Sequence, residues 1–208
     1  DAFGREVESI AADRVSTSTT RYHALSKDVY DPNDNFNDPS IDPNHRHYDT
    51  PTTFVTDGQD RLLSITERNV VAGALELYTT SFTYSPLNSL LAIERCNGST
   101  CVDRALVYDS LGRRTENHDP DAGHWQYLYT DAGDLAEVID PLAAHVEYAY
   151  DLAGRLTTED HGADLTVDVT YTFDDPGVPN GLGRLTRVDD ASGTTELSYD
   201  VRGRQTAL

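Results

Sequence analysis

The sequence predicts an all-β chain built from tandem antiparallel hairpins. A six-residue motif that suits a hairpin corner recurs along the chain. The stretches between its copies alternate in polarity, so that Val167, Val169, Tyr171 and Phe173 share one face of a strand. No stretch places apolar residues at helical spacing over more than two turns. We therefore expect twelve or more short strands joined by tight turns.

The repeated motif reads Tyr-Asp-x-x-Gly-Arg and is clearest at residues 108–113 and 150–155, with a variant at 129–134. Its first residues, Tyr108, Tyr129 and Tyr150, are 21 positions apart. A fourth unit starts in register at Tyr171 with an expanded turn, and a fifth starts at Tyr199. The residues that define these units are Tyr108, Gly112, Arg113, Tyr129, Gly133, Tyr150, Gly154, Arg155, Tyr171, Gly183, Tyr199 and Gly203.

Each letter of the motif has a physical reason. Asp at the first position of a type I turn accepts hydrogen bonds from the turn's own backbone. Gly three residues later supplies the positive φ at which a bulge rejoins the twist of the strand. Tyr at the same place in each unit is expected to stack on its neighbours across the strands.

The repeat divides the chain into three parts. Residues 54–208 are expected to form one continuous repeat domain, and residues 1–21 carry a partial repeat that begins at Asp1-Ala2-Phe3-Gly4-Arg5. Residues 22–53 read as an irregular insert rich in Asp, Asn and Pro. The sequence contains no Met and begins within a motif, which indicates a segment of a longer polypeptide.

The recurring Tyr-Asp-x-x-Gly-Arg-Leu, with Asp-Pro after some strands and the expanded turn at 180–185, resembles the YD repeats of the Rhs family. That family includes bacterial polymorphic toxins, shell subunits of insecticidal toxin complexes and the animal teneurins. The resemblance implies a curved sheet or part of a hollow spiral β-shell that encloses or displays a C-terminal toxin or effector. It also implies a secreted or cell-surface bacterial protein. No plug region and no self-cleaving aspartates are recognised, so the resemblance assigns no catalytic residue.

Composition excludes several classes of partner. The formal net charge is -20, and Lys27 is the only lysine among sixteen basic residues. Such a chain lacks the positive surface that nucleic-acid binding or adhesion to anionic lipid needs. No run of about eighteen apolar residues is present, so membrane insertion is not expected. The expected partners are the rest of the parent repeat chain, an encapsulated polypeptide and, through open strand edges, a second copy of the chain.

Cys96 and Cys101 flank a short segment in which a tight turn at Asn97-Gly98 sets them opposite each other on a hairpin. Cross-strand geometry favours a disulfide between them. Two free thiols are the alternative.

An Asp/Asn-rich stretch in the insert has the spacing of a calcium loop. Its candidate oxygen ligands are Asp31, Asn33, Asn35, Asn37 and Asp42. Phe36 stands where such a loop needs Gly, and Asp42 is shorter than the usual bidentate Glu. A solvated loop rich in turn formers is the alternative interpretation, in which the protein needs no cofactor.

Functions other than a structural wall remain open. A cell-surface adhesin or carbohydrate-binding repeat module would use exposed Trp125 and the repeat tyrosines as stacking platforms. A hydrolase would have to lie in residues 22–53. In the same segment His45 and His47 alternate around Arg46 and could bind a transition metal with a third ligand, but none is indicated, and a polar surface or packed loop is the alternative. No motif singles out a nucleophile or its base, so we expect a chain that is not an enzyme.

Overall fold

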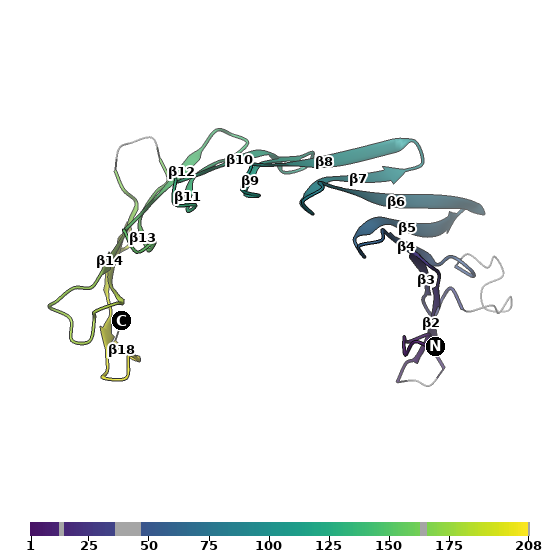
Figure 1. The fold of residues 1–208 in the computed structure, drawn as a ribbon, viewed down its shortest axis with the longest axis horizontal. Helices are drawn as coiled ribbons and strands as arrows, with labels where there is room; N and C mark the ends of the chain where they lie inside the picture. Colours follow the sequence, from purple (N-terminus) through teal and green to yellow (C-terminus); the bar gives the residue numbers. More distant parts are fainter. Residues whose placement is uncertain (13–14, 36–46, 163–165, 208) are drawn as a thin grey trace. The chain divides into compact units, whose positions relative to one another are not determined.

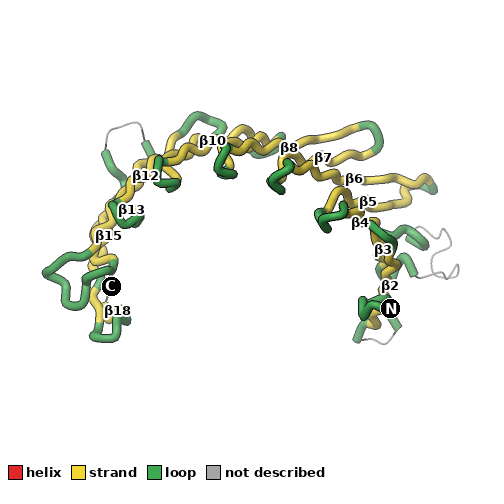
Figure 2. The backbone as a smooth tube through the Cα atoms, viewed as in Figure 1, coloured by secondary structure: helices red, strands yellow, loops and turns green. Residues whose placement is uncertain are grey.

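The protein was analysed as a computed structural model, which describes residues 1–12, 15–35, 47–162 and 166–207. In this part of the chain the regular structure is all β, and sixteen of the eighteen strands form one antiparallel sheet in chain order. β17 and β18 pair separately. Figure 2 shows the strands in yellow joined by short green connections. The predicted fold class and the expectation of twelve or more strands are confirmed.

The chain divides into two compact units, residues 1–106 and 107–208. The repeat pattern continues across this boundary, so the sequence alone does not reveal it. The first eight strands are β1 (Glu8–Ile10), β2 (Thr17–Tyr22), β3 (Ser26–Tyr30), β4 (Thr52–Thr56), β5 (Leu62–Val71), β6 (Ala74–Tyr84), β7 (Leu90–Asn97) and β8 (Thr100–Tyr108). Figure 1 labels β2 to β8.

The second unit takes up the chain from the end of β8. Its strands are β9 (Arg114–Asp119), β10 (Gly123–Tyr129), β11 (Leu135–Ile139), β12 (His145–Tyr150), β13 (Leu156–Asp160), β14 (Val169–Phe173), β15 (Leu185–Asp190), β16 (Gly193–Glu196), β17 (Ser198–Tyr199) and β18 (Gln205–Ala207).

Part of the segment predicted to be irregular is regular strand. β3 lies inside residues 22–53 and pairs on one side with β2 and on the other with β4. Its sequence, Ser-Lys-Asp-Val-Tyr, carries little apolar alternation, so the pattern did not indicate a strand. Partners on both sides, rather than its own composition, hold β3 in the sheet.

The sheet buries few side chains completely. Tyr30 and Leu106 are the buried hydrophobic residues of the described chain, at 6% and 8% exposure. Most strand residues are half-buried on both faces. Stability must therefore come from the backbone ladder and from packing between successive hairpins, as in other repeat arrays.

Candidate functional site

The repeated corner is the candidate site, and the turn between β8 and β9 shows its geometry. The side chain of Asp109 accepts hydrogen bonds from the backbone N–H groups of Leu111 and Arg113, both at 2.9 Å. The N–H of Gly112 donates to the carbonyl of Asp109 at 3.1 Å, and Gly112 has a φ of 80°. This is the type I turn with a left-handed glycine that the motif predicts.

The same side-chain bonds recur at four other corners, in one of which Asp60 rather than Gly has the positive φ. An aspartate Oδ1 accepts the N–H groups two and four residues later at Asp1, Asp57, Asp151 and Asp200. The ladder slips by one residue at the aromatic residue before the corner, between Ala149 and Tyr150 for example. The slip is the bulge expected of this turn.

Each corner arginine joins its own turn to the next hairpin. The Arg113 Nε donates to Asp109 Oδ2 at 2.7 Å. Its guanidinium lies 4.6 Å from the ring centroid of Tyr129, and its Nη1 donates to the carbonyl of Thr130 at 3.3 Å in the following corner. The pairs that repeat this stacking are Arg5 with Tyr22, Arg61 with Tyr84, Arg155 with Phe173 and Arg184 with Tyr199. One cation–π contact therefore couples each of these corners to the next unit.

The hydroxyl groups of the repeat tyrosines complete the coupling. Tyr129 donates to the carbonyl of Arg114 at 2.8 Å, and Tyr150 donates to that of Leu135 at 2.9 Å. Tyr199 donates to the carbonyl of Leu185 at 2.6 Å. In each case the acceptor follows the last residue of the preceding corner. These rings are therefore joined to neighbouring units through hydroxyl bonds and arginine contacts. The predicted stacking of tyrosine on tyrosine stays a prediction.

The prediction for Tyr171 is wrong. Phe173, directly before Asp174, takes the repeat position, because the Arg155 guanidinium lies 4.4 Å from its ring centroid and Phe173 pairs with Leu185. Tyr171 instead donates its hydroxyl to Glu159 at 2.8 Å. Phe173 lies 23 positions after Tyr150, so a 21-residue count from Tyr150 falls two positions short of the corner.

Two corners depart from the motif and keep its backbone bonds. At residues 130–134 Thr130 replaces Asp, and its Oγ1 accepts the N–H of Asp134 at 3.1 Å. In the expanded corner the Asp174 side chain accepts the N–H of Gly183, nine residues later. Gly133 and Gly183 both have positive φ, at 100° and 77°. The left-handed glycine is therefore kept in these two corners, whereas Asp60 and Asn88 take its position in the corners at Asp57 and Ser85.

The corner bonds favour ionised aspartates. The backbone N–H of Arg113, followed by the guanidinium, lowers the pKa of Asp109. The backbone N–H groups of Arg155 and Arg204 do the same for the pKa values of Asp151 and Asp200. These perturbed carboxylates are fully engaged in turn geometry, which gives a structural reason for pKa shifts that elsewhere indicate catalysis.

Cys96 and Cys101 form a disulfide, as predicted. They are directly opposite in the pairing of β7 with β8, with a Cα–Cα distance of 4.0 Å. The turn centres on Gly98-Ser99, since Asn97 and Thr100 still pair, one residue later than the sequence suggested. This register puts the cysteines at a closely spaced cross-strand position.

The calcium prediction is only partly visible. Asn37 and Asp42 lie outside the described residues. Asp31 Oδ1 accepts the N–H groups of Asn33 and Asp34, and Asn35 Nδ2 donates to the carbonyl of Thr17 at 2.7 Å. The three described candidates therefore take part in a turn, and the calcium site stays a prediction.

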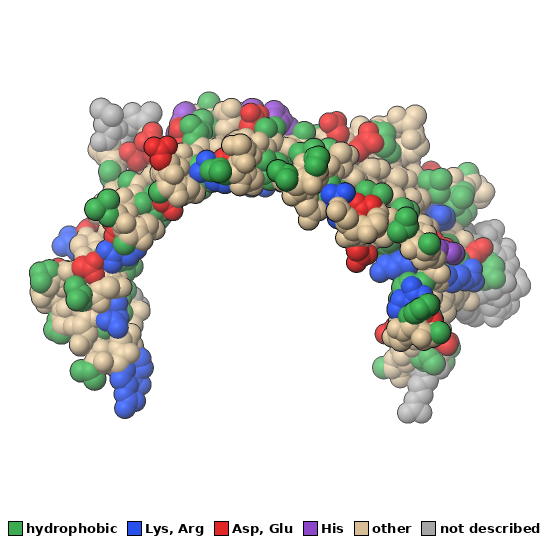
Figure 3. All heavy atoms as spheres, viewed as in Figure 1, with side chains coloured by type: hydrophobic (Ala, Val, Ile, Leu, Met, Phe, Trp, Pro, Cys, Tyr) green, Lys and Arg blue, Asp and Glu red, His purple; other side chains and the backbone are tan. Residues whose placement is uncertain are grey.

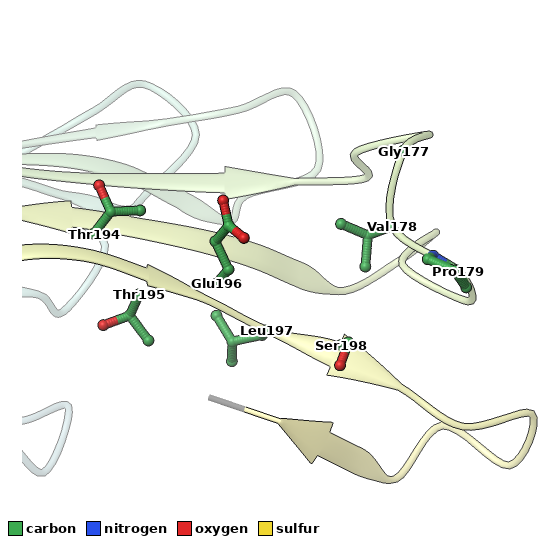
Figure 4. Close-up of a pocket in the computed structure, with 8 residues that line it drawn as sticks. All are labelled: Gly177, Val178, Pro179, Thr194, Thr195, Glu196, Leu197 and Ser198. Carbon is green, nitrogen blue, oxygen red and sulfur yellow. The ribbon is translucent and has the colours of Figure 1, made fainter.

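A groove of about 850 Å³ lies between the expanded corner and β16 (Figure 4). Val178 and Pro179 line it from the corner, and Thr194 to Ser198 line it from the strand. Its eight lining residues include no aromatic ring and one charged group, Glu196. It offers little to the stacking platform that a glycan-binding function would use.

Glu116, His118 and His124 meet on the β9–β10 hairpin and form a cluster that the sequence did not predict. The Nε2 atoms of His118 and His124 lie 2.7 and 3.0 Å from the same oxygen, Glu116 Oε2. These hydrogen bonds, His118 first, lower the pKa of Glu116. A signal was present, because His124 and His145 are one 21-residue period apart.

Comparison with known proteins agrees with this geometry. Residues 129–166 and 180–208 match the family model described as RHS Repeat. No curated protein matches the chain.

Solved structures of toxin complexes share the fold. The crystal structure of TcdB2-TccC3-Cdc42 is 20% identical with a TM-score of 0.77, over 99% of this chain and 11% of that chain. The crystal structure of TcdB2-TccC3 is 20% identical with a TM-score of 0.75 over the same shares. A Photorhabdus luminescens Tc holotoxin pore with a mutated TccC3 is 19% identical with a TM-score of 0.74, again over 99% and 11%. The chain thus spans about a tenth of the length of these structures.

The matched residues include the Tyr150 and Tyr199 corners, whose geometry is the same as that of the unmatched Asp57 and Asp109 corners. Residues 129–166 and 180–208 therefore carry RHS repeats, and the chain is folded as an antiparallel repeat sheet like that of these toxin structures.

Proposed function

We propose that the chain is a non-catalytic wall segment of a secreted RHS-repeat shell that encloses or displays a C-terminal toxin or effector polypeptide. The observation that carries the proposal is the corner arginine. It bonds its own turn and stacks on the ring of the next unit, as Arg113 does with Asp109 and Tyr129. A side chain that fastens each hairpin to the next is suited to a continuous barrier. The likeness to TcdB2-TccC3 and to a Tc holotoxin pore that carries a TccC3 mutation supports the toxin context.

Exposed apolar side chains at the corners support a larger assembly. Turns of the repeat type present apolar side chains with 75% exposure or more at Phe3, Leu87, Leu111, Leu152, Leu182 and Val201. Soluble monomers rarely expose a recurring apolar series of this kind. In a larger wall such tips would be covered by further chain.

The absence of catalysis is also part of the proposal. The strongly engaged aspartates have their oxygens committed to corner amides and arginines, so they are poorly placed to act as acids, bases or nucleophiles. We expect no turnover of ester, peptide or glycoside substrates by the purified chain. Activity above background that survives repurification would contradict this part.

The wall function is tested on the parent polypeptide by limited proteolysis. We expect the sequence that follows the repeats to resist a protease in the folded parent and to be cut rapidly once Gly112 and Gly154 are both changed to Val, since Val is strained at positive φ. Ala153→Ser, at an exposed position of the same corner whose backbone bond it keeps, is the matched control and should keep the protection. Equal cleavage of the following sequence in the parent and as an isolated polypeptide would refute enclosure.

Adhesion to glycans remains a distinct outcome. Trp125 is half-buried, and its indole N–H already donates to the carbonyl of Ala122 at 3.0 Å. A glycan array probed with the wild-type chain and with Trp125→Ala separates the two functions. Binding that depends on Trp125 would favour the adhesin.

A further inference from the structure

The β9–β10 hairpin presents three metal-ligating side chains on one face. His118 and His124 are directly opposite each other in the strand pairing, and Glu116 lies two residues before His118 on the same face. The centroids of the two imidazole rings are 4.0 Å apart, and both Nε2 atoms contact Glu116 Oε2. The two histidine side chains are 47% and 43% exposed, so an ion can reach them. The space-filling view shows exposed histidine side chains in purple (Figure 3).

The distances suit one small cation. The three ligand atoms lie within 4.8 Å of one another. Histidine nitrogen and carboxylate oxygen bind Zn²⁺ at about 2.0–2.2 Å, so two ligands of a tetrahedral ion are about 3.3 Å apart. The oxygen-to-nitrogen separations of 2.7 and 3.0 Å are close to this value. The imidazole rings have only to turn out of their stacked arrangement, and solvent surrounds them.

The backbone that carries these ligands is fixed by its corner. Asp119 Oδ1 accepts the N–H groups of Asp121 and Ala122, both at 2.9 Å. Gly123 has a φ of 81°, and a Cβ built on it would lie 2.6 Å from the ring of Pro141 in the next hairpin. A metal site gains affinity from a rigid scaffold, because less freedom is lost when the ion binds.

We propose that Glu116, His118 and His124 form a binding site for a transition-metal cation of the zinc type, with water in the remaining position. Two imidazoles and one carboxylate match the ligand preference of Zn²⁺, Cu²⁺ and Ni²⁺, whereas Ca²⁺ and Mg²⁺ prefer oxygen alone. The bound ion fastens β9 to β10 and thereby stabilises the hairpin by mass action.

The next hairpin supplies a natural control. The equivalent positions 21 residues later carry Glu137 for Glu116 and His145 for His124, but Ile139 for His118. Glu137 already bonds His145, and Ile139 is directly opposite His145. β11 and β12 therefore hold two of the three ligands in the same register.

The first experiment is calorimetric titration of the metal-free chain with ZnCl₂ in excess Mg²⁺, which occupies carboxylate-only sites. We expect one zinc site whose affinity falls at least tenfold in His118→Gln and in His124→Gln. It should be unchanged in His145→Gln. Ile139→His should raise the stoichiometry from one to two. Circular dichroism checks that the variants keep the fold, since the exchanged histidines are exposed.

The second experiment uses fluorescence. Trp125 is the only tryptophan and directly follows His124, so bound Cu²⁺ should quench its emission. We expect the quenching in the wild type and in His145→Gln, and its loss in His124→Gln. Zinc binding or quenching that is unaffected by the loss of both His118 and His124, or no binding at all, overturns the proposal.

Discussion

At each corner that carries the complete motif, a glycine, an aspartate and an arginine have separate physical tasks. Gly154 has a φ of 74°, where a side chain is strained even though open space surrounds its Cα. Asp151 satisfies two turn amides, and Arg155 holds the Asp151 carboxylate from the other side at 2.7 Å. Local bonds of this kind explain why six letters specify the same turn wherever they occur.

Glycine substitutions separate backbone strain from packing. Gly154→Ala meets no atom within 4 Å and should lower the free energy of unfolding by about 1 kcal/mol through strain alone. Gly123 has a similar φ of 81°, but the alanine Cβ would also collide with Pro141. Gly123→Ala should therefore lower the free energy of unfolding clearly more than Gly154→Ala does. Ala143 is a non-glycine residue with a φ of 61°, so Ala143→Gly should instead raise the free energy of unfolding. Urea unfolding of the three variants checks the order, and equal costs at Gly154 and Gly123 would contradict it.

The corner aspartates predict a loss of stability in acid. Their folded pKa values are lowered, so their contribution is complete above the unfolded value of about 3.9 and is lost as the pH falls through that value to the folded pKa. Melting temperatures measured by circular dichroism between pH 7 and pH 2.5 should fall over this window.

Asp151→Asn is the control for the acid effect. It should melt below the wild type at pH 7 and show a shallower acid dependence, because one titrating group is gone. Acid also relieves charge repulsion in a chain with a net charge of -20. This effect is common to both proteins, so it cancels in the difference between their melting temperatures. Parallel curves would rule out this role for Asp151.

At the scale of the hairpin, the aromatic ring before each corner couples one unit to the next. The ring lies under an arginine of the preceding unit in five cases. Tyr150 is an exception, because Asp134 stands where the corner arginine would be, yet its hydroxyl still reaches Leu135. The hydroxyl and the cation are therefore separable parts of the coupling.

Removal and addition of one hydroxyl test this coupling. Tyr150→Phe leaves the Leu135 carbonyl without its side-chain donor and should cost about 1 kcal/mol. Phe173 occupies the equivalent position without a hydroxyl, and the register places the carbonyl of Leu156 where Leu135 stands for Tyr150. Phe173→Tyr should therefore stabilise the chain by up to about 1 kcal/mol. Denaturant midpoints report both changes, and destabilisation by Phe173→Tyr would argue against the shared register.

The sequence was informative where chemistry is local and uninformative where pairing is long-range. The corners at Gly112 and Gly154 were predictable because turn amides, positive φ and the aspartate cap lie within six residues. Tyr171 was misplaced because the corner lies 23 positions after Tyr150, at Phe173, while another tyrosine stands at the 21-residue position.

The same limit applies to the candidate sites. The disulfide was predictable because Cys96 and Cys101 share one tight hairpin. Glu116 and His124 are eight residues apart, and only the pairing of β9 with β10 brings them together. β3 was missed because its partners, rather than its own residues, define it as a strand.

At the scale of the whole chain, an open edge strand predicts self-association. β1 pairs on one side with β2, and the bonds of Val7 with Thr20 and of Ala11 with Ser16 set the ladder register. In this register the N–H groups of Glu8 and Ile10 point away from β2. Such an edge is a template for another strand.

Ile10→Pro removes one outward N–H without removing a bond to β2. Sedimentation velocity should show concentration-dependent association of the wild type at raised ionic strength, where the charge repulsion is screened, and less association of Ile10→Pro. Ile10→Thr controls for the exposed side chain and should behave like the wild type. Association that Ile10→Thr abolishes would place the contact on the side chain instead.

The chain-order sheet also determines how the protein can be made. In the sixteen-stranded sheet each strand after β1 pairs with the one synthesised just before it, so contact order is low. A hairpin can add to the growing edge as soon as its corner emerges from the ribosome or from a secretion channel. Assembly by successive addition would leave only the newest edge exposed at any moment, which limits the time available for misfolding.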